Sequence, residues 1–230
     1  MTNTTFKNAC GLDEAGHLST ARDVAVMSRE MLLNHPQITN YTTIWMDTLR
    51  GGATQLLNTN KLLKRYQGVT GLKTGTTSGA GVCISASASR DGLNLLAVVL
   101  GAASSAERFD AATALLDYGF ANFENVAAPA PENAPASLPV TGGAEESVEL
   151  RYAAPEKILV QKGEGAALTA ALELPGTLAA PLAEGQQVGT VTVYSGETAL
   201  GSWPVTAASA VQPMTMRLGF ERLLAALTAH

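Results

Sequence analysis

The residues of this chain best suited to chemistry are Lys73, Thr74 and Gly75, followed by Thr76. On a strand that borders a cleft, a lysine places a cation beside an acyl-transfer centre, and a threonine hydroxyl can hold a substrate carboxylate. A glycine has no side chain, so a peptide can approach the strand edge and pair with it. The backbone N–H of Thr76 could then point at a developing oxyanion. The other interpretation is an ordinary surface strand with an exposed lysine.

Three β-prone runs predict the strands that would position this tripeptide. The middle run alternates apolar residues with serines, which is the period of a strand with one buried face. Turn formers at 76–81 and the Asp-Gly pair at 91–92 join the runs. We therefore expect three consecutive antiparallel strands, the first of which carries Lys73. The runs are 69–74, 82–88 and 93–100.

A helix is predicted over 106–123, after a capping serine at Ser104 or Ser105. Arg108 lies in its first turn, where the helix dipole disfavours a cation. This misfit predicts a nearby anion, and the alternative is an ordinary solvated arginine. The candidate anions are Glu107, Asp110 and a substrate carboxylate.

Two further segments belong to the same predicted domain. A helix capped by Ser19 or Thr20 is predicted to run to about residue 33, and the region 41–45 stays undecided between extended and helical structure. The two asparagines of Asn58-Thr59-Asn60 either contact substrate or serve turn geometry.

Length and composition are typical of a globular protein with one large or two ordinary domains. The 230 residues are 46% hydrophobic and 15% charged, which argues against overall disorder. A net charge of −5 speaks against a nucleic-acid partner. The apolar runs are too short to span a bilayer, and no signal peptide is recognised at the first residues. Cys10 and Cys83 are expected as buried or half-buried thiols, and the histidine and cysteine spacing predicts no metal or other cofactor.

Charge and composition change near residue 127, which predicts a domain boundary. Residues 1–126 carry ten Lys/Arg and ten Asp/Glu, whereas three basic residues and nine glutamates follow up to residue 213. The Pro/Ala-rich stretch 127–139 is typical of a linker. Short alternating runs over 140–213 predict a small β-sandwich, and 214–230 is predicted as an amphipathic tail that either contacts a membrane surface or docks on the sandwich. The runs are 148–152, 157–161, 168–174, 188–194 and 200–205.

Two long stretches, 56–120 around Lys73-Thr74-Gly75 and 3–32 before it, resemble the serine-type D-alanyl-D-alanine carboxypeptidases. These are the low-molecular-mass penicillin-binding proteins of peptidase family S11. KGEGA, ELPG and APLAEGQQVGTVTV in the later part resemble the family's C-terminal all-β domain. The resemblance implies an α+β fold: a partial penicilloyl-serine transferase (β-lactamase-like) domain with an antiparallel sheet and helices, followed by a small all-β sandwich domain.

The resemblance also implies a function in peptidoglycan maturation. Members of the family remove the terminal D-Ala of stem peptides through an acyl-enzyme. By resemblance, Lys73, Thr74 and Gly75 belong to the catalytic strand, and Thr76 and Arg108 to substrate binding. The implied partners are a stem peptide ending in D-Ala-D-Ala and, for the full-length protein, β-lactams. The implied location is the cell envelope, in the periplasm or on the outer face of the cytoplasmic membrane.

The sequence departs from the family at the nucleophile. The family's acylating serine lies in S-x-x-K and its second catalytic serine in S-x-N. No serine of this chain is followed by lysine at the third position or by asparagine at the second. We therefore expect the C-terminal portion of a larger enzyme, inactive alone. The alternative is a non-catalytic cell-envelope binding protein derived from this family; a β-lactamase-like hydrolase is disfavoured because the linker and second domain match the carboxypeptidases.

Overall fold

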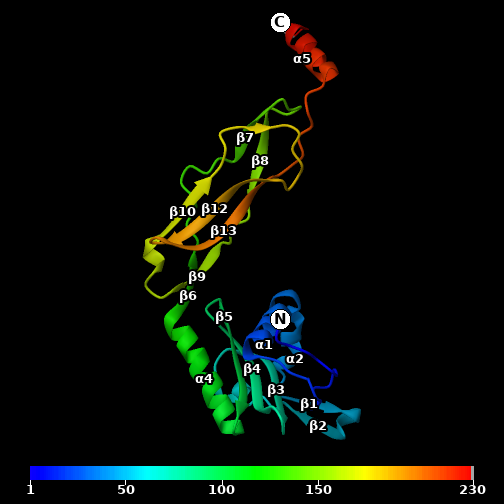
Figure 1. Cartoon of the computed structure of the whole chain (residues 1–230), viewed down its shortest axis with the longest axis vertical. Coiled ribbons are helices and arrows are strands. Elements are labelled where there is room, and N and C mark those ends of the chain that lie inside the picture. Colours follow the sequence, from blue (N-terminus) through cyan, green and yellow to red (C-terminus); the bar gives the residue numbers. More distant parts are fainter. Residues whose placement is uncertain (229–230) are drawn as a thin grey trace. The chain divides into compact units, whose positions relative to one another are not determined.

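The structure is a computed structural model of the 230-residue chain, and it describes residues 1–228. The chain divides into two compact units, Met1–Glu124 and Asn125–His230. They are coloured blue through green and green through red in Figure 1. Each unit has hydrophobic cores of its own, so each is described by itself.

The first unit is built on a three-stranded antiparallel sheet. Its strands are β3 (Val69–Thr77), β4 (Gly81–Arg90) and β5 (Leu93–Ala102), in that order. All three predicted strands are confirmed, and each extends beyond its predicted run. β3 is an outer strand and pairs only with β4 within this sheet, so no strand of this sheet pairs with its second edge.

Helices cover both faces of this sheet (Figure 1). α1 (Ala21–Asn34) begins after its N-cap Thr20, and α4 (Ser105–Asn122) after its N-cap Ser104, as the sequence predicted. α1 lies on the face that carries Ser85, since the Ser28 and Ser85 hydroxyl oxygens are 2.8 Å apart. α4 packs on the opposite face, where each fully buried leucine or isoleucine contributes roughly 1.5–3 kcal/mol. The buried residues of that core are Leu62, Ile84, Ala86, Ala88, Ala97, Phe109, Ala112 and Leu116.

Short elements between α1 and β3 complete the first unit. β1 (Met46–Leu49) and β2 (Thr54–Leu57) form an antiparallel pair. The region that the sequence left undecided holds the end of a short helix and the approach to β1. The remaining short elements are η1 (Pro36–Ile38), α2 (Thr39–Thr42), η2 (Arg50–Gly52) and α3 (Leu62–Arg65).

The second unit is made of β-strands, apart from one 3₁₀ turn and a terminal helix. The five predicted strands are confirmed, while β6, β7 and β11 were not predicted. β6 ends at Ala127 and β7 begins at Ser137, so regular structure enters both ends of the predicted linker 127–139. The elements are β6 (Phe123–Ala127), β7 (Ser137–Thr141), β8 (Ser147–Tyr152), β9 (Lys157–Gln161), η3 (Gly165–Ala167), β10 (Leu168–Glu173), β11 (Leu178–Ala179), β12 (Gln187–Ser195) and β13 (Thr198–Ala207).

Two sheets form the layers of this unit. The larger has the order β10-β12-β13-β8-β7-β11, and β6 pairs with β9 in the smaller. Ile158 and Val160 of β9 pack on Val193 of β12, so the smaller sheet lies against the larger one. A second core joins β7, β8 and β13 with the segments around Leu182 and Val211. In packed sheets, every second residue of a strand points inward, and the alternating runs in the sequence predicted this arrangement.

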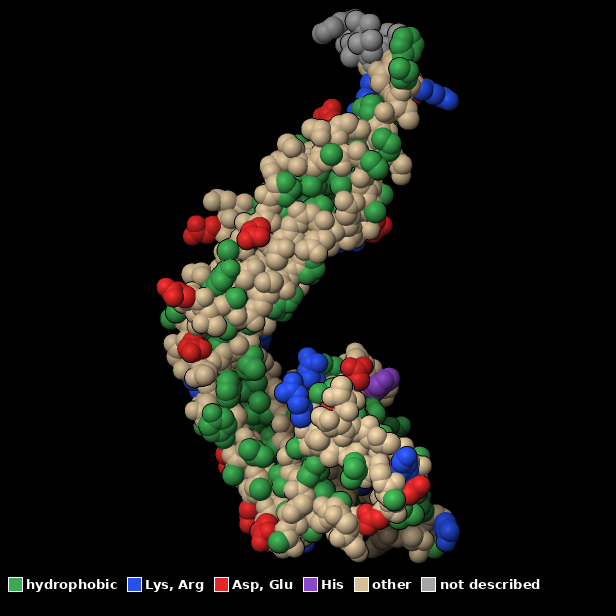
Figure 2. Space-filling model, in the orientation of Figure 1, with side chains coloured by type: hydrophobic (Ala, Val, Ile, Leu, Met, Phe, Trp, Pro, Cys, Tyr) green, Lys and Arg blue, Asp and Glu red, His purple; other side chains and the backbone are tan. Residues whose placement is uncertain are grey.

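The second unit is rich in glutamate, but its acidic side chains do not form a cluster on the face that Figure 2 shows. Its acidic side chains lie apart from one another there. Arg151 and Glu184 form an exposed ion pair, with 3.2 Å between Nη1 and Oε1. Exposed pairs of this kind contribute about 0–1 kcal/mol, so charge in this unit is a matter of solubility more than of fold.

The tail forms α5 (Met216–Thr228). Met216 and Phe220 are exposed, and Arg222 donates a hydrogen bond to the carbonyl of Ala144. The sequence predicts an apolar face of six residues in this tail, of which the side chains at 223, 224 and 227 lie outside those that the structure describes. The six residues are Met216, Leu218, Phe220, Leu223, Leu224 and Leu227. Within residues 1–228, no helix combines the length and apolar character needed to cross a membrane.

Candidate functional site

Lys73 and Thr74 lie on opposite faces of β3, because successive side chains of a strand alternate. Lys73 pairs with Ser85, on the face that α1 covers; it is exposed and its ammonium donates to the Thr74 carbonyl. Thr74 pairs with Ile84, on the face that α4 covers, and is only 8% exposed. The two polar side chains of the tripeptide can therefore act on different parts of a bound ligand.

Gly75 and Thr76 follow on the same strand, and both are exposed. A Cβ atom built on Gly75 would meet no atom within 4 Å. The face of the sheet is therefore open at the glycine of the tripeptide, and no strand pairs with the outer edge of β3 within this sheet, so a peptide backbone could approach there.

The serine opposite Lys73 is a packing residue. Ser85 is 6% exposed, and its hydroxyl is bonded to that of Ser28, which is 4% exposed. This buried pair ties α1 to β4. Because its hydroxyl is enclosed and already paired, Ser85 does not serve as a nucleophile for Lys73 to assist.

The loop before α3 brings an additional hydroxyl to the tripeptide. The Thr59 and Thr74 hydroxyl oxygens are 2.5 Å apart. The flanking asparagines bond to main chain: Asn58 Nδ2 donates to the Thr42 and Ile44 carbonyls, and Asn60 Nδ2 to the carbonyl of Gly71. Of the two roles left open for the asparagines, these bonds favour loop geometry. Sequence reasoning missed Thr59, which lies between them.

Arg108 reaches from the first turn of α4 to the tripeptide. It is 5% exposed, so the solvated alternative is wrong. Its Nη1 donates to the carbonyl of Cys83 at 3.0 Å and, at a longer 3.4 Å, to that of Gly75; its Nη2 donates to the Ser105 hydroxyl at 3.3 Å. The guanidinium is thus bonded to the main chain of both β3 and β4.

The charge of Arg108 has no carboxylate partner among the described residues. Glu107, one of the predicted anions, instead accepts a hydrogen bond from the backbone of Ala103. Burial lowers the pKa of the Arg108 guanidinium below its ordinary value. Its Nε is buried without a hydrogen-bond partner. A buried cation with an unused donor is suited to receive an anion.

Asp13 ties the loop before α1 to the turn that follows the tripeptide. Its Oδ2 accepts a hydrogen bond from the Gly79 N–H at 3.1 Å. Hydrogen bonds from the Thr77 hydroxyl and this N–H hold the pKa of Asp13 below its ordinary value. The sequence analysis did not predict this contact between residues that are 66 positions apart.

The two cysteines differ from each other. Cys83 is half-buried, as expected, and its Sγ donates to the Ala80 carbonyl at 3.3 Å. Cys10 is exposed, so the expectation for it was wrong: it lies in a surface loop organised by the side chain of Asn8. Within the part of the chain that is described, no group of three or more His, Cys, Asp or Glu residues could hold a metal ion.

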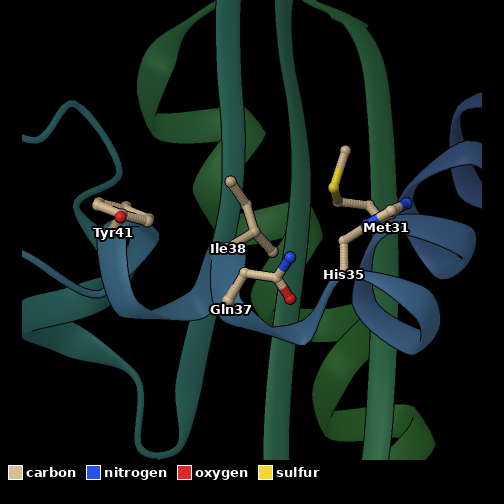
Figure 3. A pocket seen from close by; sticks show the side chains of 5 residues that line it. All are labelled: Met31, His35, Gln37, Ile38 and Tyr41. Carbon is tan, nitrogen blue, oxygen red and sulfur yellow. The ribbon is translucent and has the colours of Figure 1, made fainter.

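A pocket of about 320 Å³ lies on the α1 side of the first unit, separate from the tripeptide. Met31 and His35 come from the end of α1, Gln37 and Ile38 from η1, and Tyr41 from α2. Figure 3 shows these side chains in front of the strands, with α4 behind the sheet. The pocket is mostly apolar and holds none of the predicted site residues.

Comparison with known proteins accounts for both units. The D-alanyl-D-alanine carboxypeptidase family model matches residues 1–104, and the model of the penicillin-binding protein 5 C-terminal domain matches residues 123–213. The chain is 36% identical to the D-alanyl-D-alanine carboxypeptidase DacF of Bacillus subtilis (strain 168) over 211 residues, 90% of this chain and 54% of DacF. It is 35% identical to DacC of Escherichia coli (strain K12), over 83% of this chain and 48% of DacC.

Comparison with solved structures indicates the same family. Penicillin-binding protein 5 from Haemophilus influenzae matches with a TM-score of 0.78 and 30% identity, over 91% of this chain and 61% of that protein. The chain therefore belongs to the D-alanyl-D-alanine carboxypeptidase family, peptidase S11, with a penicillin-binding protein 5 C-terminal domain. It spans about half the length of the curated relatives that it matches. The predicted α+β fold with a following β domain is confirmed.

Proposed function

We propose that this chain is the K-T-G-bearing part of a serine-type D-Ala-D-Ala carboxypeptidase of peptidoglycan maturation. The observation that carries the proposal is the unpaired outer edge of β3, with open space at Gly75 and the buried Arg108 guanidinium bonded to the Gly75 carbonyl. A peptide that pairs with this edge would bring its C-terminal carboxylate toward a cation that has no counter-ion among the described residues.

Each site residue has a role in this proposal. Lys73 supplies positive charge beside the reacting centre, on the α1 face of the strand. Gly75 leaves room for the peptide backbone, and the Thr76 N–H supports the developing oxyanion. Thr74 and Arg108 bind the terminal carboxylate, the former by a hydroxyl hydrogen bond and the latter by charge.

The nucleophile comes, in this proposal, from an S-x-x-K segment outside these 230 residues. Its serine oxygen attacks the carbonyl carbon of the penultimate D-Ala, and the terminal D-Ala leaves with a proton on its amine. Water then attacks the acyl-serine, which releases the shortened peptide and returns the proton to the serine. β-Lactams would acylate the same serine. These 230 residues alone would be inactive.

The proposal also covers the location of the protein, its substrate and the roles of the second unit and the tail. The protein acts in the cell envelope, outside the cytoplasmic membrane, on stem peptides that end in D-Ala-D-Ala. The second unit supports the catalytic domain, and the tail makes a peripheral membrane contact through Met216 and Phe220. The exposure of these two apolar side chains supports that contact.

A fluorescent penicillin tests the proposal. The 230-residue chain should take up no label, whereas the product of the gene together with its in-frame upstream sequence should be labelled and should release D-Ala from a D-Ala-D-Ala peptide. A covalent adduct on the 230-residue chain would contradict the assignment of the nucleophile to another segment. An in-frame upstream sequence that encodes no S-x-x-K would contradict the enzymatic proposal.

The second candidate is a non-catalytic cell-envelope protein that binds peptidoglycan peptides. It is favoured by one observation: no serine of the chain has the S-x-x-K or S-x-N spacing. It predicts saturable binding of a D-Ala-D-Ala peptide to the 230-residue chain by calorimetry, without release of D-Ala. The enzymatic proposal instead predicts release of D-Ala by the protein that also contains the upstream segment.

A further inference from the structure

The segment Asn58-Thr59-Asn60 is fixed by hydrogen bonds from both of its asparagines, one to the chain at the end of α2 and before β1 and the other to β3. Asn58 Nδ2 donates to the Thr42 carbonyl at 3.2 Å and to the Ile44 carbonyl at 3.0 Å. Asn60, which is 3% exposed, donates from Nδ2 to the Gly71 carbonyl at 3.1 Å. Thr59 therefore sits in a loop whose position does not depend on its own hydroxyl.

The Thr59 hydroxyl contacts Thr74 of the tripeptide, with 2.5 Å between the two oxygens. Thr74 is 8% exposed, so solvent has little access to it, whereas Thr59 is exposed. Each hydroxyl has one proton and two lone pairs, so either can be the donor in the free protein. Which of them donates decides what Thr74 can offer a ligand.

We propose that Thr59 is a positioning residue that donates its proton to the Thr74 oxygen, so that Thr74 directs its own proton at the substrate carboxylate. This inference rests on the carboxypeptidase function proposed above. A carboxylate only accepts hydrogen bonds, so Thr74 must be the donor to it. The Thr74 oxygen can then be supported only by another donor, and Thr59 is the hydroxyl within reach.

Two hydroxyls in series strengthen each other. When Thr59 donates to Thr74, it polarises the Thr74 O–H bond and makes it a better donor to an anion. The effect acts on binding of the carboxylate, not on the acyl-transfer step. Loss of one neutral hydrogen bond of this kind corresponds to about a threefold to tenfold change in an equilibrium constant.

The test uses the full-length carboxypeptidase that carries this chain. Thr59→Val removes the hydroxyl but keeps the shape, Thr59→Ser keeps the hydroxyl, and Thr48→Val is a matched control at an exposed threonine of β1. Each variant is assayed on a peptide ending in D-Ala-D-Ala and on an acyl ester whose leaving group has no carboxylate.

Thr59→Val should raise KM for the peptide about threefold to tenfold, with kcat changed less than about twofold and the ester unaffected. Thr59→Ser and Thr48→Val should resemble the wild type. In the Thr74→Val background, Thr59→Val should have no further effect, because it acts through Thr74.

Equal losses on both substrates, a Thr59→Ser variant as impaired as Thr59→Val, or additive effects with Thr74→Val would overturn the positioning role. A wild-type enzyme that is active, with an unchanged Thr59→Val variant, overturns this inference alone. A wild-type enzyme inactive on both substrates overturns the proposed function as well.

Discussion

Gly71 and Gly75 lie on the same strand, but alanine should destabilise the first unit at Gly71 and leave its stability nearly unchanged at Gly75. A Cβ at Gly71 would come within 2.6 Å of Thr42 Oγ1, and the residue has φ +153°, which side-chain-bearing residues rarely adopt. The strained backbone costs about 1–3 kcal/mol. Thr42 must also move, and its 2.6 Å hydrogen bond to the Thr70 carbonyl contributes about 0.5–1.5 kcal/mol.

Gly71→Ala should therefore lower the free energy of unfolding of the first unit by roughly 2–4 kcal/mol. Gly75→Ala should change it by less than about 0.5 kcal/mol, because its Cβ meets only open space. Urea denaturation of the 230-residue chain, followed by a probe in the first unit, measures both. Equal stabilities of the two variants would show that the packing of Thr42 against β3 is not as described.

Gly75 should instead matter for activity. In the full-length enzyme, Gly75→Val places a branched side chain where the substrate backbone pairs with β3. Displacing a substrate by about 1 Å can cost about a hundredfold, so kcat/KM should fall at least tenfold while stability stays near that of the wild type. A fully active Gly75→Val enzyme would refute the assignment of this edge to substrate binding.

Three further substitutions test the site, and limited proteolysis tests the domain division. Lys73→Ala should lower kcat/KM by about a hundredfold or more, by analogy with the loss of an oxyanion-hole donor; near-normal turnover would leave Lys73 an ordinary surface lysine. Thr74→Val should raise KM for a D-Ala-D-Ala peptide while leaving acylation by an ester without a carboxylate unchanged, which the two-substrate assay measures. Arg108→Met should weaken peptide binding and also destabilise the chain by about 1–3 kcal/mol, since two carbonyls lose their donor; an unaltered KM would exclude carboxylate binding. Limited proteolysis should cut within 127–139 and leave two protected fragments, and a single protected core across that stretch would contradict the division.

Local signals explain which elements could be predicted from the sequence. The strand alternation around Ile84, the Asp91-Gly92 turn and the caps Thr20 and Ser104 are each encoded within a few residues, and all are present. β7 was missed because its first three residues lie at the end of the Pro/Ala-rich stretch 127–139, although its residues alternate between buried and exposed. A proline is tolerated there because its missing N–H need not be a ladder donor.

The contacts that shape the site could not be predicted in this way. Thr59 meets Thr74 across 15 residues, and Asp13 meets Gly79 across 66. No periodic pattern in the sequence predicts either contact, because each contact depends on how separate elements pack. The sequence did contain the necessary residue types, but a hydroxyl or a carboxylate in a loop is far more often a turn residue than a partner of a site.

The unfavourable position of Arg108 in the first turn of its helix pointed to a functional site, but the contacts that accommodate the residue differ from the predicted anion. Its place in the first turn of α4 suggested an anion nearby, yet its partners are two carbonyls and one hydroxyl, all neutral. A buried guanidinium that lacks a counter-ion carries a desolvation cost, and this burial lowers the pKa of Arg108. A carboxylate that binds beside it would offset part of that cost, because the hydrogen bonds already hold the guanidinium in place. A site that keeps a cation in this condition is prepared for an anion, which supports the carboxylate-binding role proposed for Arg108.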